Sequence, residues 1–137
     1  MKSIILFIWQ LPQNILGLLV ILFTQAFKTR DGRYWVCNYG YFGVSLGRYI
    51  IFGDCNGRML IPDASIKHET GHSKQSLYLG PLYLLIIGLP SITFNIYDRI
   101  AHRSWGAVIR YKWYYSLPWE AWADRLGGVS RVFRQGD

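Results

Sequence analysis

Three residues near the middle of the chain have the types and spacing that suit metal chemistry. They are His68, Glu69 and His72, in the pattern His-Glu-x-x-His. Residues four positions apart lie on one face of an α-helix, so the two imidazoles would point toward one place. Two imidazole nitrogens at this spacing can bind zinc, and Glu69 can act as general base on a water molecule. The spacing therefore predicts a metal site on a helix.

A second pair with helical spacing, Glu120 and Asp124, follows near the end of the chain. A catalytic zinc ion usually takes three protein ligands and leaves its fourth position to water. His-Glu-x-x-His with a downstream Glu-x-x-x-Asp resembles the gluzincin metallopeptidases. The resemblance implies that His68, His72 and Glu120 bind zinc and that Glu69 is the general base. It also implies that Asp124 holds the outer nitrogen of a ligand histidine, which would fix its tautomer.

Gly71 allows a second interpretation of the same motif. It makes the pattern His-Glu-x-Gly-His, which is similar to the site-2 intramembrane proteases. In that family an Asp from a later apolar segment is the third ligand, which implies Asp124 in place of Glu120. We favour Glu120, because a buried Glu in a polar helix requires a reason to be there. The gluzincin resemblance covers two helices and not the whole chain.

A hydrolase of this type also needs a hydrogen-bond donor for the oxyanion of its transition state. Tyr114, Tyr115 and His102 precede the last helix and are the candidates, and we select Tyr115 as the second catalytic residue beside Glu69. The alternative is that these rings only anchor the chain at a membrane interface. Gln75, one turn beyond His72, either orients the site or ends the helix.

The composition indicates apolar surroundings. Hydrophobic residues make up 51% of the 137 residues, and charged residues make up 17%, against about a quarter in soluble domains. The net charge of +7, with abundant Trp and Tyr, suits a membrane surface with anionic lipid. No nucleic-acid-binding motif is visible, so we expect membrane lipids and not nucleic acid as a partner. Cys37 and Cys55 have no metal-site spacing and are expected to be free thiols.

Residues 1–27 are predicted to form an apolar, membrane-associated helix. The apolar runs Ile4–Trp9 and Ile15–Phe23 are separated by Gln10, Pro12, Gln13 and Asn14. Each run is shorter than the roughly 20 residues that a membrane span needs, and no clean signal-peptide cleavage site follows. Either a Pro-bent helix crosses the bilayer, or a helix pair lies in its interface.

Basic residues predict the topology of the two apolar stretches. If residues 1–27 cross the membrane, the basic cluster that follows places the rest of the chain in the cytoplasm; this cluster is Lys28, Arg30 and Arg33. Basic residues lie on both sides of the second apolar stretch, 77–92, and a crossing would put one set outside. We therefore predict that residues 77–92 do not cross, and that they turn near 88–91 or form the core.

The predicted fold class is α+β, with a single, mainly helical domain over residues 28–137. A short antiparallel sheet should precede the motif helix, with two strands within 35–44 and 45–52 joined by a turn near Tyr41–Gly43 and a short third strand at Arg58–Ile61. Asp63 is the expected N-cap of the motif helix. That helix should end at Leu79 before Gly80-Pro81. The last helix should begin at Pro118 and end at Gly127-Gly128, and residues 129–137 should form a short, charged, frayed tail.

The sequence thus predicts a membrane-associated zinc metallopeptidase with a cytoplasmic catalytic domain. It would hydrolyse peptide bonds of a protein or peptide through a metal-activated water, with Glu69 as general base. Three alternatives remain open: a zinc amidase, a membrane-binding protein with a structural metal, and a nucleic-acid binder. The gluzincin resemblance also places residues 43–52 where zincins have an edge strand that pairs with substrate. The substrate and the oligomeric state stay open.

Overall fold

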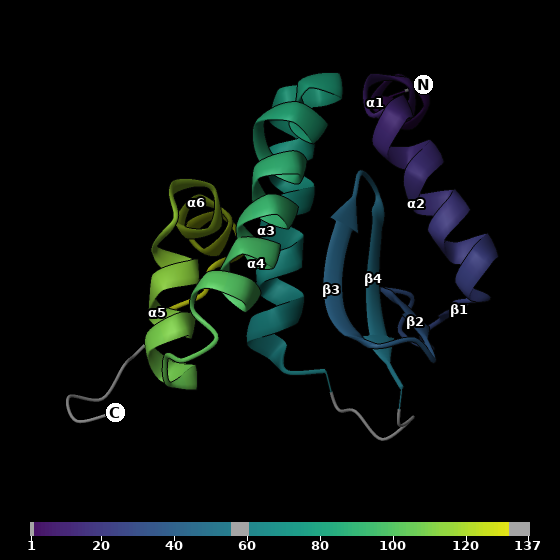
Figure 1. The fold of residues 1–137 in the computed structure, drawn as a ribbon. Helices are drawn as coiled ribbons and strands as arrows, with labels where there is room; N and C mark the ends of the chain where they lie inside the picture. The colour runs from purple at the N-terminus through teal and green to yellow at the C-terminus, as the bar shows by residue number, and fades with distance from the viewer. Residues whose placement is uncertain (1, 56–60, 132–137) are drawn as a thin grey trace.

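The structure is a computed structural model that describes residues 2–55 and 61–131. It is an α+β arrangement in which a small sheet lies between helix α2 (Leu11–Thr24) and helix α3 (Asp63–Leu79). Figure 1 shows α2 on the outer side of the sheet and α3 in the centre of the molecule, where α4 overlaps it in this view, with α5 and α6 beyond. Of these helices, α6 packs extensively against α3.

The sheet has four strands in the order β1-β2-β4-β3. Their bounds are Phe27–Lys28, Trp35–Cys37, Tyr41–Leu46 and Tyr49–Asp54 for β1 to β4. Strands β2 and β4 pair in parallel and the other pairs are antiparallel, so the prediction of a purely antiparallel sheet was wrong. The residues expected at Arg58–Ile61 lie largely outside the described part of the chain.

The predicted position of the hairpin turn was also wrong. Residues 41–43 belong to β3, and the turn is at Gly47-Arg48, where Leu46 pairs with Tyr49. Gly47 has a φ of +64°, which a two-residue hairpin turn requires and which a residue without a Cβ adopts at little cost. Gly47 therefore decides the register, although three other glycines in this region offered alternatives.

The two faces of the sheet pack against different helices. Ile21, Cys37 and Ile51 form a buried cluster on the α2 face. Ile50, Phe52 and Ile66 form the cluster on the α3 face. Neighbouring residues of β4 thus point to opposite sides, as the alternation of a strand requires. Strands β1 and β3 are the two edges of the sheet, and β3 lies along α3.

Helix α3 ends at Leu79, as the sequence predicted, and begins at Asp63, one residue before the predicted start. Asp63 is not its N-cap: that place belongs to Pro62, no side chain caps the helix, and Asp63 pairs with Lys67 at 2.7 Å. Gly80 ends the helix with a φ of +54°. Most of the side chains that α3 buries are polar, which leaves His68 and its neighbours in need of polar partners inside the protein.

The N-terminal segment is a helix pair, α1 (Lys2–Trp9) and α2, that bends at Gln10. The polar side chains at and after the bend face the protein. Gln10 and Gln13 donate to the Ser76 hydroxyl at 2.8 and 2.9 Å, and Gln13 also donates to the Gly80 carbonyl at 2.7 Å. These hydrogen bonds attach the segment to the end of α3.

The second apolar stretch is helical from Leu84 to Ala101, with a π turn at Leu84–Gly88 followed by α4 (Leu89–Ala101). Pro90 lacks an amide hydrogen and crowds the carbonyl four residues earlier, and the wider π turn relieves that clash. Among the described residues, Leu84–Ala101 is long and apolar enough to cross a membrane by length and composition. Helices α5 (Ala107–Ser116) and α6 (Pro118–Gly127) follow, and α6 has the predicted bounds.

Candidate metal centre

The site lies where α3 and α6 cross, and this crossing is very close. A Cβ on Gly71 would stand 1.9 Å from the Ala123 carbonyl oxygen, and a Cβ on Gly127 would stand 2.0 Å from the Lys67 carbonyl oxygen. A glycine on each helix is therefore what allows the two backbones to touch. Gly71, which suggested similarity to the site-2 proteases, has a packing role here.

The crossing brings three acceptor atoms together. The Nε2 atoms of His68 and His72 are 3.1 Å apart, and Glu120 Oε2 lies 3.0 and 3.1 Å from them. All three side chains are buried. Tetrahedral ligands at zinc bond lengths of about 2.0–2.1 Å are about 3.3 Å apart, so the three atoms fit a single metal ion of that kind. The sequence-predicted ligands therefore meet, and Glu120, not Asp124, is the third member.

The outer nitrogens of both histidines are held by acceptors. His68 Nδ1 lies 2.7 Å from Asp124 Oδ1, and His72 Nδ1 lies 2.7 Å from Gln75 Oε1. The Gln75 amide is oriented because its nitrogen donates to the Trp119 carbonyl at 2.8 Å. An acceptor at Nδ1 places the hydrogen there, which leaves the Nε2 lone pair free to bind a metal. Gln75 thus orients the site, one of the two roles that the sequence left open.

Glu120 is held by its other carboxylate oxygen. Oε1 accepts hydrogen bonds from the Ser91 hydroxyl at 2.6 Å and from the Tyr114 hydroxyl at 2.9 Å. Ser91 lies at the start of α4 and Tyr114 near the end of α5, so two further helices support this residue. Glu120 therefore presents one oxygen to the histidines, while the other is satisfied by the protein.

Arg131 holds the Asp124 carboxylate in position through hydrogen bonds, as Ser91 and Tyr114 hold Glu120. Its guanidinium donates to both carboxylate oxygens of Asp124, at 2.8 Å for Oδ1, and lies 3.4 Å from the centre of the Tyr115 ring. The sequence placed Arg131 in a frayed tail, which was wrong for this residue. The Tyr115 ring in turn packs edge-on against His68, with 5.1 Å between centroids.

Glu69 occupies the space between α3 and the edge strand. A Cβ on Gly43 would stand 2.8 Å from Glu69 Oε1, so glycine at this position makes room for the carboxylate. The side chain is buried, and this burial raises the pKa of Glu69, although the nearby His72 and His68 offset part of the effect. A carboxylate with a raised pKa is a better proton acceptor, which suits a general base.

The metal-free cluster already favours a positive charge at its centre. Burial opposes the charged form of His68, but hydrogen bonds with Asp124 and Glu120 outweigh it and raise the pKa of His68 to about 9. Burial would raise the pKa of Glu120, but hydrogen bonds with His68 and His72 hold it far below its usual range. Without a metal, this shift of the His68 pKa favours the protonated form of His68 beside the Glu120 carboxylate.

The three candidates for the oxyanion donor lie in different places in the structure. Tyr114 is engaged with Glu120, and Tyr115 lies beside His68. His102 lies in another cluster, where it contacts Asp98 at 3.1 Å and stacks on Trp105. Burial raises the pKa of both Tyr114 and Tyr115, so each hydroxyl keeps its proton and can donate.

Sequence reasoning missed Ser91 and Arg131 as parts of the site. Ser91 follows a proline in an apolar stretch, so a polar side chain in apolar surroundings was its only signal. Arg131 gave no signal, because a basic residue near a chain end is usually solvated.

No protein-family model, curated protein or solved structure matches this chain. The assignment of the site therefore depends on the geometry of its side chains.

Proposed function

We propose that the protein is a zinc-dependent metallopeptidase of gluzincin type, associated with a membrane. One observation carries this proposal: three buried acceptor atoms of His68, His72 and Glu120 converge, and their opposite atoms are all held by hydrogen-bond partners. Three neighbouring acceptors need a cation between them, and two imidazoles with one carboxylate are a ligand set that zinc prefers.

His68, His72 and Glu120 would supply three ligands, the number that catalytic zinc sites use, whereas structural sites use four. When bound, the metal would supply a Lewis acid that polarises the substrate carbonyl and makes a water molecule more acidic. Glu69 then takes the proton of the attacking water and passes it to the leaving amine. Tyr115 is the proposed donor to the oxyanion. Asp124 and Gln75 keep the histidine tautomers in place.

The edge strand β3 offers a place for an extended peptide. The Tyr83 hydroxyl donates to the Ser45 carbonyl at 3.1 Å, so this carbonyl points away from β4. Alternate residues of a strand direct their backbone groups to the same side. The backbone of Gly43 therefore also faces the free edge, next to Glu69. A substrate paired with this edge would hold its peptide bonds close to the general base.

The test compares Glu69→Gln with Asp63→Asn, a change of an exposed acid on the same helix. The purified protein is loaded with zinc and incubated with a peptide library, and the products are identified by mass spectrometry. Glu69→Gln should keep stoichiometric zinc and lose cleavage by at least about 100-fold. Asp63→Asn should behave as the wild type does.

The same experiment tests the other possible roles of the metal. If the wild type with bound zinc leaves every peptide intact, the peptidase assignment is wrong, and an amidase activity on other substrates becomes the next candidate. If Glu69→Gln cleaves peptides as fast as the wild type, Glu69 is not the general base. Loss of zinc from Glu69→Gln would instead show that Glu69 maintains the metal site.

A further inference from the structure

Two stretches of the chain carry no Asp, Glu, Lys or Arg: the residues between Lys2 and Lys28, and the residues between Lys74 and Asp98. They contain α1, α2, the end of α3, the π turn and most of α4. In Figure 1 α1, the end of α3 and the π turn gather at the top of the view, α2 runs down its right side, and α4 runs down its middle, overlapping α3. Segments that are far apart in the sequence thus contribute to one uncharged surface.

The helix pair α1–α2 buries polar side chains and exposes apolar ones, the reverse of a helix on the surface of a soluble protein. Gln10, Gln13 and Asn14 are at most 4% exposed, and their amide groups donate to Ser76, Gly80 and Phe7. Ile21 and Val20 pack against the sheet, but the other described aliphatic residues of the pair point outward and are about half exposed. They include Ile4, Ile5, Ile8, Ile15, Leu18 and Leu22. A helix in water buries its apolar side, so this arrangement suits an apolar solvent.

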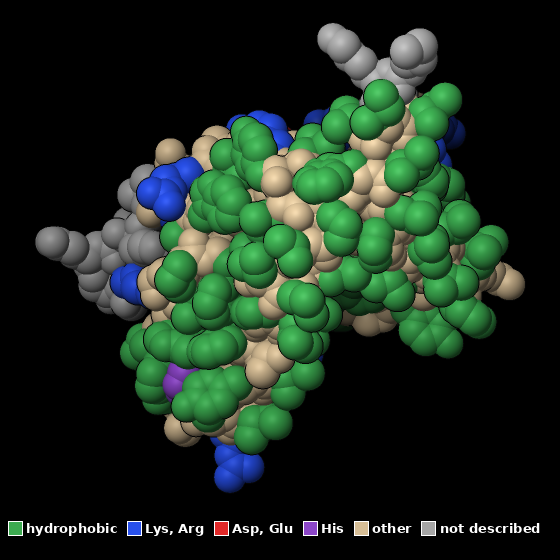
Figure 2. Space-filling model, turned by 90° about the horizontal axis from the view of Figure 1, so that it is seen from above, with side chains coloured by type: hydrophobic (Ala, Val, Ile, Leu, Met, Phe, Trp, Pro, Cys, Tyr) green, Lys and Arg blue, Asp and Glu red, His purple; other side chains and the backbone are tan. Residues whose placement is uncertain are grey.

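The second stretch repeats this arrangement. Apart from Thr93, its exposed residues are apolar or aromatic; among them are Leu82, Leu85, Ile86, Leu89, Ile92 and Ile96. Figure 2 shows the end of the molecule that carries both stretches: hydrophobic side chains cover most of it, basic side chains lie at its margins, and no acidic side chain is visible among the coloured residues. Such a continuous apolar patch exceeds what the surface of a soluble monomer usually exposes.

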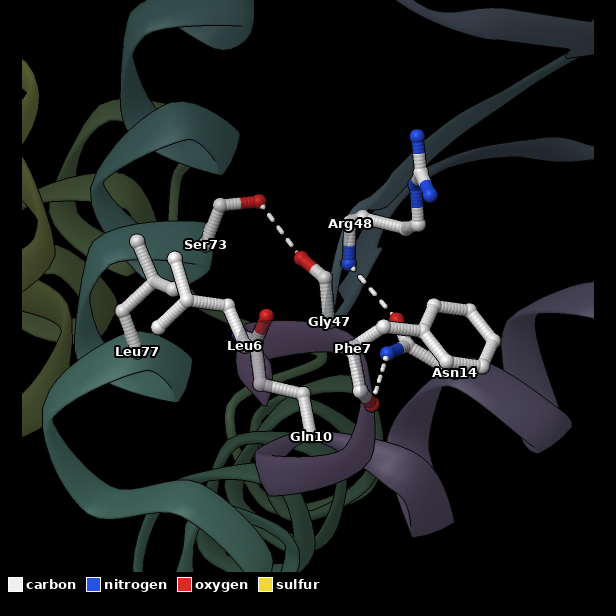
Figure 3. A pocket seen from close by; sticks show the side chains of 8 residues that line it. All are labelled: Leu6, Phe7, Gln10, Asn14, Gly47, Arg48, Ser73 and Leu77. Atoms are coloured by element: carbon white, nitrogen blue, oxygen red, sulfur yellow. Dashed lines mark hydrogen bonds between the residues drawn. The ribbon is translucent and has the colours of Figure 1, made fainter. Parts of the chain in front are cut away.

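A cavity of about 500 Å³ opens between α1 and the β3–β4 turn (Figure 3). Leu6, Phe7 and Leu77 form apolar walls, and Asn14 is already paired with the Arg48 backbone at 3.0 Å. The Arg48 guanidinium lies 6.0 Å from the centre of the Phe7 ring. The cavity thus has apolar walls and one cationic side chain. The walls suit the acyl chain of an anionic phospholipid, and the cation suits its headgroup.

We propose that this surface is embedded in the hydrocarbon layer of a lipid bilayer, with the basic margin at the anionic headgroups. A lipid bilayer fits better than a second copy of the chain, because the surface wraps around α1, α2 and α4 and is not a flat patch. Lipid also explains why buried amides coincide with exposed aliphatic side chains. The location of this surface in a bilayer does not depend on whether His68, His72 and Glu120 bind a metal.

The test uses variants with one introduced cysteine in a Cys55→Ser background, in which the remaining native cysteine, Cys37, is buried. Ile5→Cys and Leu85→Cys report on the apolar end. Tyr39→Cys is the matched control, because it precedes β3 at the other end of the sheet. The three native side chains are 63%, 66% and 67% exposed, so the positions differ in place and not in accessibility.

Each variant receives an environment-sensitive fluorophore and is reconstituted into vesicles of phosphatidylcholine with a minor fraction of phosphatidylglycerol. We expect labels at positions 5 and 85 to emit as in an apolar medium, to be quenched by nitroxides on the acyl chains and to resist aqueous iodide. The label at position 39 should behave in the opposite way. Iodide quenching at positions 5 and 85 equal to that at 39 would overturn the proposal.

Self-association has a different signature. If the labels at positions 5 and 85 are shielded from iodide but not quenched by acyl-chain nitroxides, and the shielding rises with the protein-to-lipid ratio, a second copy covers the surface and the proposal fails. Arg48→Gln tests the margin. It should weaken binding to anionic vesicles about five-fold and leave binding to pure phosphatidylcholine unchanged. An equal change on both vesicles would contradict the headgroup contact.

Discussion

Gly71→Ala adds one methyl group at the contact between α3 and α6. The new Cβ would stand 1.9 Å from the Ala123 carbonyl oxygen, whereas real Cβ contacts are essentially never below 3.0 Å. The neighbouring atom is backbone and cannot rotate away. The two helices must therefore move apart by about 1 Å at this point.

That movement changes the metal site directly. His68 and His72 are on α3, and Glu120 is on α6, three residues from Ala123. Metal–ligand distances tolerate only about 0.2 Å, so a displacement of about 1 Å withdraws the third ligand. We expect zinc affinity to fall by more than about 100-fold, beyond what the loss of an outer hydrogen bond produces. Overpacking should also lower the free energy of unfolding by about 1–3 kcal/mol.

Two measurements check this prediction. Zinc affinity is obtained by competition with a chromophoric chelator, and stability by thermal unfolding of the metal-free protein. Gly88→Ala is the matched control, because its nearest neighbour would be a flexible Leu84 methyl at 3.6 Å. It should keep zinc affinity and gain stability from a better helix former. Wild-type zinc affinity in Gly71→Ala would refute the reasoning, since it would show that the crossing can widen without moving Glu120.

Four other outcomes are expected. Asp124→Asn should weaken zinc binding about 10–100-fold, because the His68 outer nitrogen loses its charged acceptor; Glu120→Gln should lose more, and the reverse order would favour Asp124 as the ligand. Ser91→Ala leaves one donor to Glu120 and should lower zinc affinity less than Asp124→Asn does, by the same competition assay. Gly43→Ala should keep zinc and slow peptide cleavage, because its Cβ would stand 2.8 Å from Glu69 Oε1; unchanged cleavage would place Glu69 elsewhere. Zinc affinity should rise with pH up to about 9, because zinc must displace the proton that His68 holds below its pKa of about 9; calorimetry at pH 7 that finds no proton release would contradict this.

The elements that local sequence determines were predicted well. The bounds of α3 and α6 follow from Gly80 and Pro118, which end and begin helices through their own backbone chemistry. The pairing of His68 with His72 needs only the helical repeat. The bend at Gln10 follows from a polar interruption next to Pro12.

The elements that depend on contacts between distant parts of the chain were not predicted correctly. The turn at Gly47-Arg48 and the parallel pairing of β2 with β4 depend on which strand edges meet, and several glycines in this region suited a turn equally well. Asp63 has the chemistry of an N-cap, but Lys67 engages its carboxylate instead. Arg131 becomes part of the site only because α6 directs the chain back toward Tyr115.

The candidate metal site depends both on local sequence and on the way distant parts of the chain pack together. The sequence by itself determined the ligand types, since His68, His72 and Glu120 lie at spacings that a helix converts into common faces. Only the tertiary structure decided between Glu120 and Asp124, because both lie on the same side of α6 and their distances to the histidines differ only once α6 is placed. The close crossing at Gly71 makes that choice: it brings Glu120 to the two Nε2 atoms and leaves Asp124 at the outer nitrogen of His68.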